Sequence, residues 1–335
     1  MDAGRAERGR LGGPTLRRLA AVVLTGVALV SGCATEENPA DPLQLAATLE
    51  PARPAASPEQ AGAPRGRVVP SGRATAVAVA GGRVAVAVAD PPSVALYPLD
   101  TLGDPLVVPL PGPAERLVTV GDAVEAVVPA GVVVTIRPDG TTSSRNVDGA
   151  PVDVARVGDR TLVAQRDLRQ VSVDGHVVRG ISSPDRLVAV DGAAVVLDRP
   201  RSAVFDLDPG ADGPGAGLRA GEGATNAVAD RFGRVLVVDT RGGELMAFST
   251  GPLIMRLRYP VPGAPYGMAY DETRDLVWIT LTERNEVVAF DVAGAEPVER
   301  HRFATVRQPD SVAVDPGSGR VFVASGDGAG MQVIG

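Results

Sequence analysis

The sequence predicts an all-β fold, because short runs of alternating apolar and small residues recur along most of the chain, whereas apolar residues spaced three and four apart do not. Pairs of these runs flank tight turns, as Ala74–Ala80 and Arg83–Val88 flank two glycines, which is the pattern of a β-hairpin. Seven such turns lie 33 to 44 residues apart, at residues 81, 121, 158, 191, 230, 271 and 315. A repeat of about 40 residues built of short strands is typical of propeller blades. We therefore predict a seven-bladed β-propeller over residues 67–335.

Residues 1–32 have the features of a bacterial lipoprotein signal peptide. An arginine-rich start precedes the apolar run Leu19–Val30, and the small residues Ser31 and Gly32 then lead to Cys33 as in a lipobox. The apolar run is shorter than the ~20 residues that a transmembrane helix needs. Cys33 is the only cysteine, so an internal disulfide is excluded. We expect Cys33 to be lipidated and to hold the protein at the cell membrane, facing the extracytoplasmic side.

Residues 33–66 are predicted to form a disordered tether between the lipidated cysteine and the propeller. The segment has six prolines, at positions 39, 42, 51, 54, 58 and 64, among alanine, glutamate and glutamine, and it shows no strand or helix period. Fully extended, such a segment would reach up to ~100 Å.

The repeat units predict four strands for each blade. In the first unit the hairpin is followed by Ser93–Tyr97 and then by Leu106–Leu110. The last unit supplies only three strands and ends with Met331–Ile334. We predict that Arg67–Pro70 adds the missing outer strand to that blade, which would close the ring and cover an exposed edge.

The charge of the chain argues against a nucleic-acid partner. The formal net charge is −7, and removing residues 1–32, which carry +3, leaves −10. Nucleic-acid binding requires a basic surface, and an acidic exported domain is more simply explained by solubility. All 33 basic residues are arginine, a bias typical of a GC-rich genome. We expect a monomer.

The mouth of the central channel is the expected place for a ligand, because propellers usually bind there. Residues that directly precede each inner strand should gather on this rim. They are Arg73, Thr75, Glu115, Arg116, Asp153, Asp185, Arg186, Thr225, Asn226, Tyr266, Asp310 and Ser311. The alternative is that these loops are polar only because they face water. The repeated Asp230, Asp271 and Asp315 are expected to set the hairpin turns instead.

Catalytic signals are weak. The two histidines, His176 and His301, lie in different units without the spacing of metal ligands, and no Gly-x-Ser-x-Gly motif occurs. We therefore predict no catalytic residue, no metal and no cofactor. The single tryptophan, Trp278, is expected to fill the space between two blades.

Several segments of the C-terminal half have more distinctive sequences. They include Leu218–Thr225, Gly233–Gly243, Tyr259–Gly267 and Gln308–Ser311. In these segments the chain resembles the actinobacterial propeller lipoproteins of the mycobacterial LppL type, and more distantly NHL and YncE-type repeats. The resemblance is tight from about residue 186 onward. It implies a propeller and a lipid anchor but no activity, and the more distant repeats are mostly binding platforms.

Three functions compete at this stage. The first is a membrane-anchored, non-catalytic binding platform for a protein, a peptide or an envelope saccharide. The second is a propeller enzyme of the lactonase or quinone-dependent sugar dehydrogenase type, which would need metal or quinone ligands in the channel. The third is a structural spacer in an envelope complex.

Overall fold

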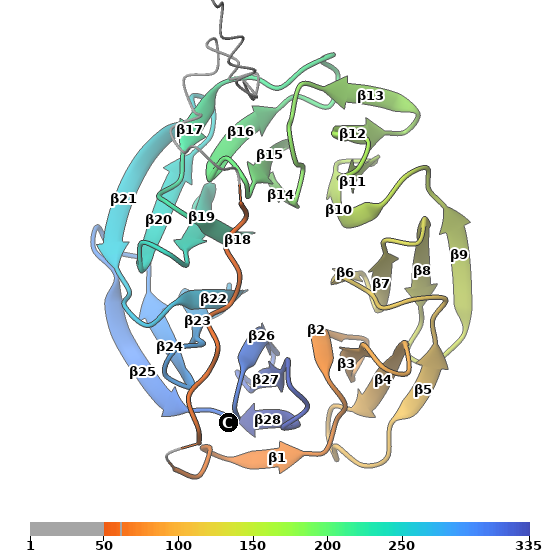
Figure 1. The fold of residues 1–335 in the computed structure, drawn as a ribbon, viewed down its shortest axis with the longest axis vertical. Coiled ribbons are helices and arrows are strands. Elements are labelled where there is room, and N and C mark those ends of the chain that lie inside the picture. Colours follow the sequence, from red (N-terminus) through yellow and green to blue (C-terminus); the bar gives the residue numbers. More distant parts are fainter. Residues whose placement is uncertain (1–49, 61) are drawn as a thin grey trace, which may run out of the picture. The chain divides into compact units, whose positions relative to one another are not determined.

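The computed structural model describes residues 50–60 and 62–335. The predicted signal peptide, the lipidation of Cys33 and the first part of the tether lie outside these residues. The described elements are 28 β-strands, arranged as seven four-stranded antiparallel sheets around a central channel (Figure 1). The predicted all-β, seven-bladed propeller is confirmed. Within residues 50–60 and 62–335 no helix is long and apolar enough to span a membrane.

Each blade runs from an inner strand at the channel to an outer strand at the circumference. The inner strands of blades one to seven are β2 (Ala74–Ala80), β6 (Arg116–Val120), β10 (Pro151–Val157), β14 (Arg186–Val190), β18 (Ala224–Ala229), β22 (Pro265–Asp271) and β26 (Pro309–Val314). The second strands are β3 (Arg83–Val88), β7 (Ala123–Val128), β11 (Arg160–Gln165), β15 (Ala193–Asp198), β19 (Arg234–Asp239), β23 (Leu276–Leu281) and β27 (Val321–Ser325). The third strands are β4 (Ser93–Pro98), β8 (Val132–Ile136), β12 (Gln170–Val173), β16 (Ala203–Leu207), β20 (Glu244–Ser249), β24 (Glu286–Asp291) and β28 (Met331–Ile334). The outer strands are β5 (Leu106–Pro109), β9 (Thr142–Asn146), β13 (His176–Arg179), β17 (Gly217–Arg219), β21 (Ile254–Pro260), β25 (Val298–Ala304) and, for blade seven, β1 (Arg67–Val69).

The ring is closed by the N-terminal strand, as predicted. β1 pairs antiparallel with β28, with Arg67 opposite Val333 and Val69 opposite Met331. Beside this pair, the buried Gln332 amide donates hydrogen bonds to the carbonyl oxygens of Arg65 and Ala304, at 2.7 and 2.9 Å. Both ends of the ring are therefore tied into one blade.

Apolar side chains of neighbouring blades pack against one another and form the core. Trp278 of blade six lies in the same buried cluster as Val312 and Val323 of blade seven, which confirms its predicted place between blades. The rings of His301 and Phe303 stack on Trp278 from the outer strand of blade six.

The recurrent turn aspartates have the predicted structural role. The Asp230 carboxylate accepts hydrogen bonds from the backbone N–H groups of Phe232 and Arg234, at 3.0 and 2.9 Å. Asp271 and Asp315 accept equivalent bonds within their own hairpins. Aspartate suits this place because its short side chain bonds the backbone of its own turn.

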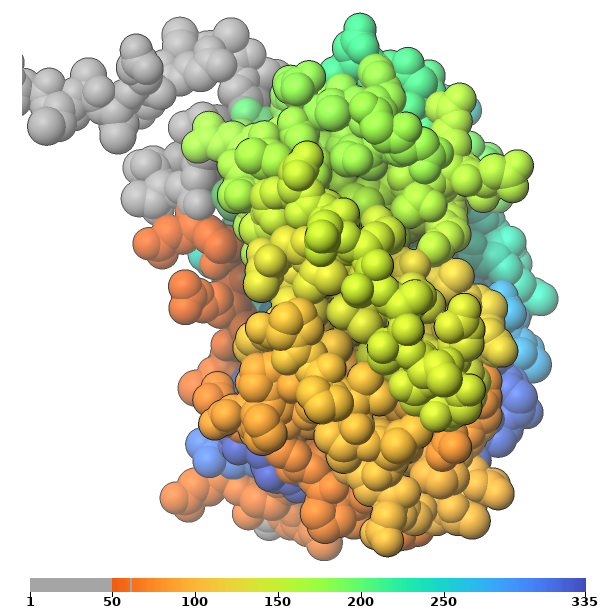
Figure 2. Space-filling model, turned by 90° about the vertical axis from the view of Figure 1, so that its right-hand side faces the viewer, coloured from red at the N-terminus to blue at the C-terminus, as the bar shows by residue number. Residues whose placement is uncertain are grey.

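Residues 50–60, which we name the strap, differ from the prediction of a disordered tether that extends to residue 66. The strap lies against the face of the propeller where the inner strands begin and crosses the edges of blades four to seven, as its hydrogen bonds to Arg199, Arg241, Thr282 and Gln308 show. In a side view its red-orange residues stand along one face of the ring (Figure 2). A pattern search misses the strap because its partners are loops far away in the sequence.

Candidate functional site

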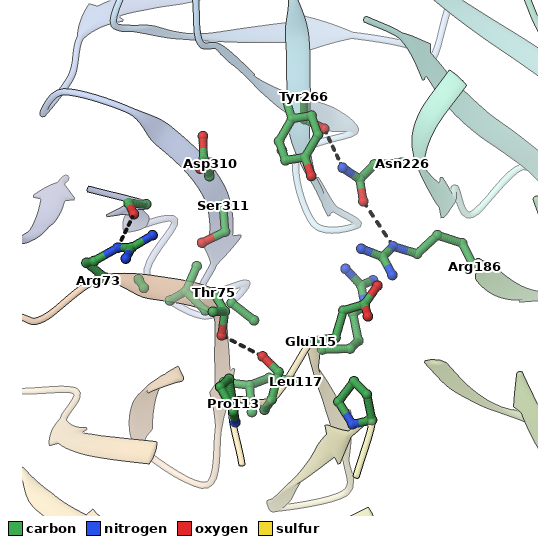
Figure 3. Close-up of a pocket in the computed structure, with 18 of the residues that line it drawn as sticks. Arg73, Thr75, Pro113, Glu115, Leu117, Arg186, Asn226, Tyr266, Asp310 and Ser311 are labelled. Atoms are coloured by element: carbon green, nitrogen blue, oxygen red, sulfur yellow. Dashed lines mark hydrogen bonds between the residues drawn. The ribbon is translucent and has the colours of Figure 1, made fainter. Parts of the chain in front are cut away.

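The inner strands bring their first residues to one end of the channel, where they surround a cavity of about 560 Å³ (Figure 3). We call this end the mouth. The predicted rim residues that line the cavity are Arg73, Thr75, Glu115, Arg116, Arg186, Asn226, Tyr266, Asp310 and Ser311. Three other predicted residues, Asp153, Asp185 and Thr225, do not line it. They are at most 3% exposed, and Asp153 lines a second cavity farther along the channel.

Hydrogen bonds join the rim residues of three consecutive blades. The Arg186 Nε donates to the Asn226 Oδ1 at 3.0 Å, and the Asn226 Nδ2 donates to the Tyr266 carbonyl oxygen at 2.8 Å (Figure 3). Arg186 is buried, and its Nη1 also donates to the Asp185 carbonyl oxygen at 3.0 Å. This relay fixes the guanidinium at the cavity wall.

Arg116 adds a second positive charge close to Arg186. Its Nε lies 3.7 Å from the Asp153 carboxylate, which also accepts the backbone N–H of Leu187 at 2.9 Å. Burial lowers the pKa of Arg116, the Asp153 charge acts in the opposite direction, and the Arg186 charge lowers the pKa further. Two guanidinium groups therefore lie close together at the mouth, and the Asp153 carboxylate compensates their positive charge only in part.

Arg166, which sequence reasoning missed, engages two acidic residues of the predicted rim. Its guanidinium forms an ion pair with Glu115, and its Nε donates to the Asp185 Oδ1 at 2.8 Å. The backbone N–H of Arg199 donates a hydrogen bond to the other carboxylate oxygen of Asp185, Oδ2, at 3.0 Å. These carboxylates are therefore already paired within the protein.

Arg199, also missed from the sequence, lines the cavity from blade four. A periodic signal could have revealed it, because Arg166, Arg199 and Arg241 follow the second strands of three consecutive blades. The second strand runs antiparallel to the first, so the residues after it lie at the same face as the residues before the inner strand. The cavity wall therefore includes residues after the second strand in blades two, four and seven, such as Arg199 and Gly326, whereas the prediction used only residues before the inner strands.

Three polar atoms of cavity-lining residues are buried without a hydrogen-bond partner in the described part of the chain. They are the Nε atoms of Arg116 and Arg199 and the Oγ of Ser311. A buried donor without a partner carries a desolvation cost of about 1–3 kcal/mol. All three atoms belong to residues of one cavity wall, so unpaired polar groups are concentrated around the mouth.

Asp310, the second carboxyl of the cavity wall beside Glu115, forms no ion pair within residues 50–60 and 62–335. Its Oδ1 accepts a hydrogen bond from the Gln308 Nε2 at 2.8 Å. Burial raises the pKa of Asp310 to about 6, although the bond to Gln308 opposes this. The charge of the Asp310 carboxyl at the mouth therefore changes with pH in the weakly acidic range.

A second cavity of about 620 Å³ lies farther along the channel, where residues of the inner strands line it, including Arg116, Asp153 and Arg156. Among residues 50–60 and 62–335, no three histidine, cysteine, aspartate or glutamate side chains gather as metal ligands. The two histidines lie on the outer strands β13 and β25, away from both cavities.

Comparison with known proteins supports the fold. No family model matches the chain, and no curated protein matches it. Among solved structures, a chain of hydrazine synthase from Kuenenia stuttgartiensis has a TM-score of 0.65 and 14% identity, covering 82% of this chain and 99% of its own. Virginiamycin B lyase from Staphylococcus aureus has a TM-score of 0.64 and 13% identity, with 77% and 93% covered. Its catalytically inactive variant with quinupristin, in which a histidine is replaced by alanine, has a TM-score of 0.64 and 10% identity, with 80% and 97% covered.

Proposed function

We propose that this protein is a lipid-anchored binding platform of the cell envelope and that the channel mouth holds an acidic ligand. The ligand class is defined by a carboxylate or phosphate group, such as those of envelope saccharides and peptide termini. The observation that carries the proposal is the convergence of Arg116, Arg186 and Arg199 on one cavity. Guanidinium groups suit carboxylate and phosphate because their donors match both oxygens of such groups.

The dimensions and charges of the mouth support this assignment. A volume of about 560 Å³ is in the range of small-molecule sites, which combine an apolar lining with few placed polar groups. Glu115 and Asp185 both pair with Arg166, so this group of three keeps one net negative charge and offsets the arginines of the wall only in part. An anion in the mouth would compensate the remaining positive charge of Arg116 and Arg186.

The cellular setting of the proposal comes from the sequence. The lipobox at Cys33 and the resemblance to actinobacterial propeller lipoproteins support an anchor on the extracytoplasmic face of the membrane. Several acyl chains hold a protein on a bilayer far more firmly than one.

The lyase comparison supplies no catalytic residue for this chain. At 10–14% identity the likeness supports the propeller architecture alone. The inactivating change in that lyase removes a histidine, whereas both histidines of this chain lie on outer strands. Binding through the arginine cluster is therefore better supported than lyase chemistry.

Titration calorimetry with inorganic phosphate and with glutarate tests the mouth. We expect saturable binding to the wild-type protein and at least a tenfold weaker affinity in the double variant Arg116→Gln/Arg199→Gln. The matched control is Arg300→Gln, which removes an exposed arginine of the outer strand β25 and should leave the affinity unchanged. Equal affinity in the double variant, or no heat with either anion, would remove the proposal.

A further inference from the structure

The strap occupies a polar groove on the rim of blades four to seven. We define the rim groove by Arg199, Gly223, Thr282, Asn285 and Gln308. Most of its contacts are to the main chain of the strap. The Ala55 N–H donates to the Thr282 Oγ1 at 3.0 Å, and the Ala55 carbonyl accepts from the Gln308 Nε2 at 3.0 Å. This backbone recognition suits an extended peptide, whose main-chain groups are otherwise unpaired.

Two strap side chains are buried, and they are five residues apart. Ala52 is 2% exposed and packs over Gly223, where an added Cβ would come within 2.9 Å of the Ala52 Cβ. The groove therefore admits only a small side chain at this position. Ser57 is 7% exposed, and its hydroxyl donates to the Thr282 carbonyl at 2.6 Å while it accepts the Gln308 N–H at 3.1 Å.

Gln308 is the centre of the rim groove. Its side-chain oxygen accepts the Ser57 N–H at 3.0 Å, and its backbone adopts a φ of 52°, a left-handed conformation that is uncommon for glutamine. Asn285, with the same φ, donates from its Nδ2 to the Pro58 carbonyl oxygen at 3.0 Å. Both side chains are thus held toward the strap by the shape of their own loops.

The strap is attached more weakly than the strands. It belongs to no sheet, and the exposed residues Pro51, Arg53, Ala56, Pro58 and Glu59 alternate with the few buried or half-buried ones. A segment with few buried apolar contacts opens at a small fraction of the global unfolding free energy. The groove can therefore exchange its occupant while the ring stays folded.

We propose that the rim groove is a peptide-binding site and that the strap is its resident occupant in cis. The partner it fits is an extended, proline-containing segment of another protein, with a small residue followed five positions later by serine. This site adjoins the proposed anion site at the mouth and shares Arg199 with it, but its other contacts are to main-chain groups of the strap and to Ser57. A partner segment would compete with the strap, whose tethering gives it an effective concentration on the order of 1 mM.

The test starts from the complete folded chain with a protease recognition sequence inserted between the exposed Gly62 and Ala63. Cleavage and dilution release the strap, and fluorescence anisotropy then measures the binding of a labelled synthetic peptide of residues 50–60. Circular dichroism before and after cleavage verifies that the ring stays folded. We expect saturable binding that the unlabelled peptide reverses.

Matched peptides decide whether the rim groove is the site. Ala52→Leu and Ala56→Leu make the same change at a buried and at an exposed position, so we expect the first to weaken binding at least tenfold and the second to leave it unchanged. Ser57→Ala should weaken binding as well. No saturable binding to a folded ring, or equal binding of the two leucine peptides, would overturn the proposal whatever the mouth binds.

Discussion

Asp198 shows how a single buried carboxyl shapes a blade of this ring. It lies at the end of β15, is fully buried, and accepts backbone N–H groups of Ser183 and Arg201 at 3.1 Å each. Burial raises the pKa of Asp198 to about 6, although these hydrogen bonds oppose the change. Asp239 holds the equivalent place in blade five and accepts the N–H groups of Glu222, Gly223 and Gly242.

The raised pKa values of Asp198 and Asp310 predict how stability depends on pH. Each group binds its proton more tightly in the native state, with a pKa of about 6, than in the unfolded chain, whose value is near 3.8. The unfolding free energy therefore falls as pH rises from about 4 to above 6, by at most about 3 kcal/mol for each group. Urea unfolding at pH 4.5 and at pH 7.5 measures this difference.

Substitution of Asp198 and Asp310 separates their contribution to the pH dependence of stability from that of the other titratable groups. In Asp198→Asn/Asp310→Asn the decline between the two pH values should be smaller than in the wild-type protein, because neither position can release a proton. The control Asp159→Asn changes an exposed hairpin residue and should keep the wild-type slope. An unchanged slope in the double variant would contradict the assignment.

At the scale of residues, the sequence identified the rim only in part. Residues before the inner strands could be read from the strand pattern, and nine of the twelve named there line the mouth. Arg199 was missed because its position depends on the antiparallel return of the second strand. The burial of Asp153 and Asp185 depends on neighbouring blades, which no local pattern contains.

The closing strand β1 illustrates prediction at the scale of elements. Arg67 and Val68 are exposed, Val68 to 38%, whereas Val69 is buried against the core of blades seven and one. The closing strand could be predicted from the sequence because the last repeat unit lacked one strand and a short extended run preceded the first unit. The pairing itself joins residues more than 260 positions apart, such as Arg67 and Val333.

Charge substitutions in β1 test the difference in burial between Val69 and Val68. Val69→Lys should destabilise the protein by about 2 kcal/mol or more, because it buries an unpaired charge at the seam of the ring. The same change at the exposed Val68 should alter the unfolding free energy by less than about 0.5 kcal/mol. Thermal unfolding of both variants measures the difference, and equal effects would mean that β1 does not close the ring in solution.

The strap shows where element prediction fails. Its prolines and lack of period are those of a flexible linker, and nothing local distinguishes it from one. Its order comes from hydrogen bonds to the loops of blades four to seven, for example between Ser57 and Gln308. Such contacts exist only after the ring has formed.

At the scale of the whole molecule, the strap shortens the reach that the sequence suggested. If Cys33 carries the lipid and the strap is docked, the number of residues between Cys33 and Glu50 limits the distance from the anchor to the strap to at most ~60 Å. A released strap would restore the longer reach to the start of β1. Peptide binding in the rim groove would then also change how far the propeller stands from its anchor.

A substitution at Cys33 tests the proposed lipid anchor. Cys33→Ser removes the only thiol that could be lipidated, so the protein should leave the membrane fraction and appear in the soluble or secreted fraction. Thr35→Ser, two residues later, is the control and should stay with the membrane. Detergent partitioning of the two variants measures the outcome, and membrane retention of the Cys33→Ser protein would contradict a lipid anchor at this position.

The sequence by itself determined the number of blades, the closing strand and the general location of the mouth, because strand alternation and turn residues are local patterns that repeat. It also determined the acidic character of the chain and the lipobox at Cys33. Tertiary structure alone decided which rim residues face the cavity, which carboxylates pair with Arg166, and where the strap lies. These features join residues of different blades, and such neighbours exist only once the ring has closed.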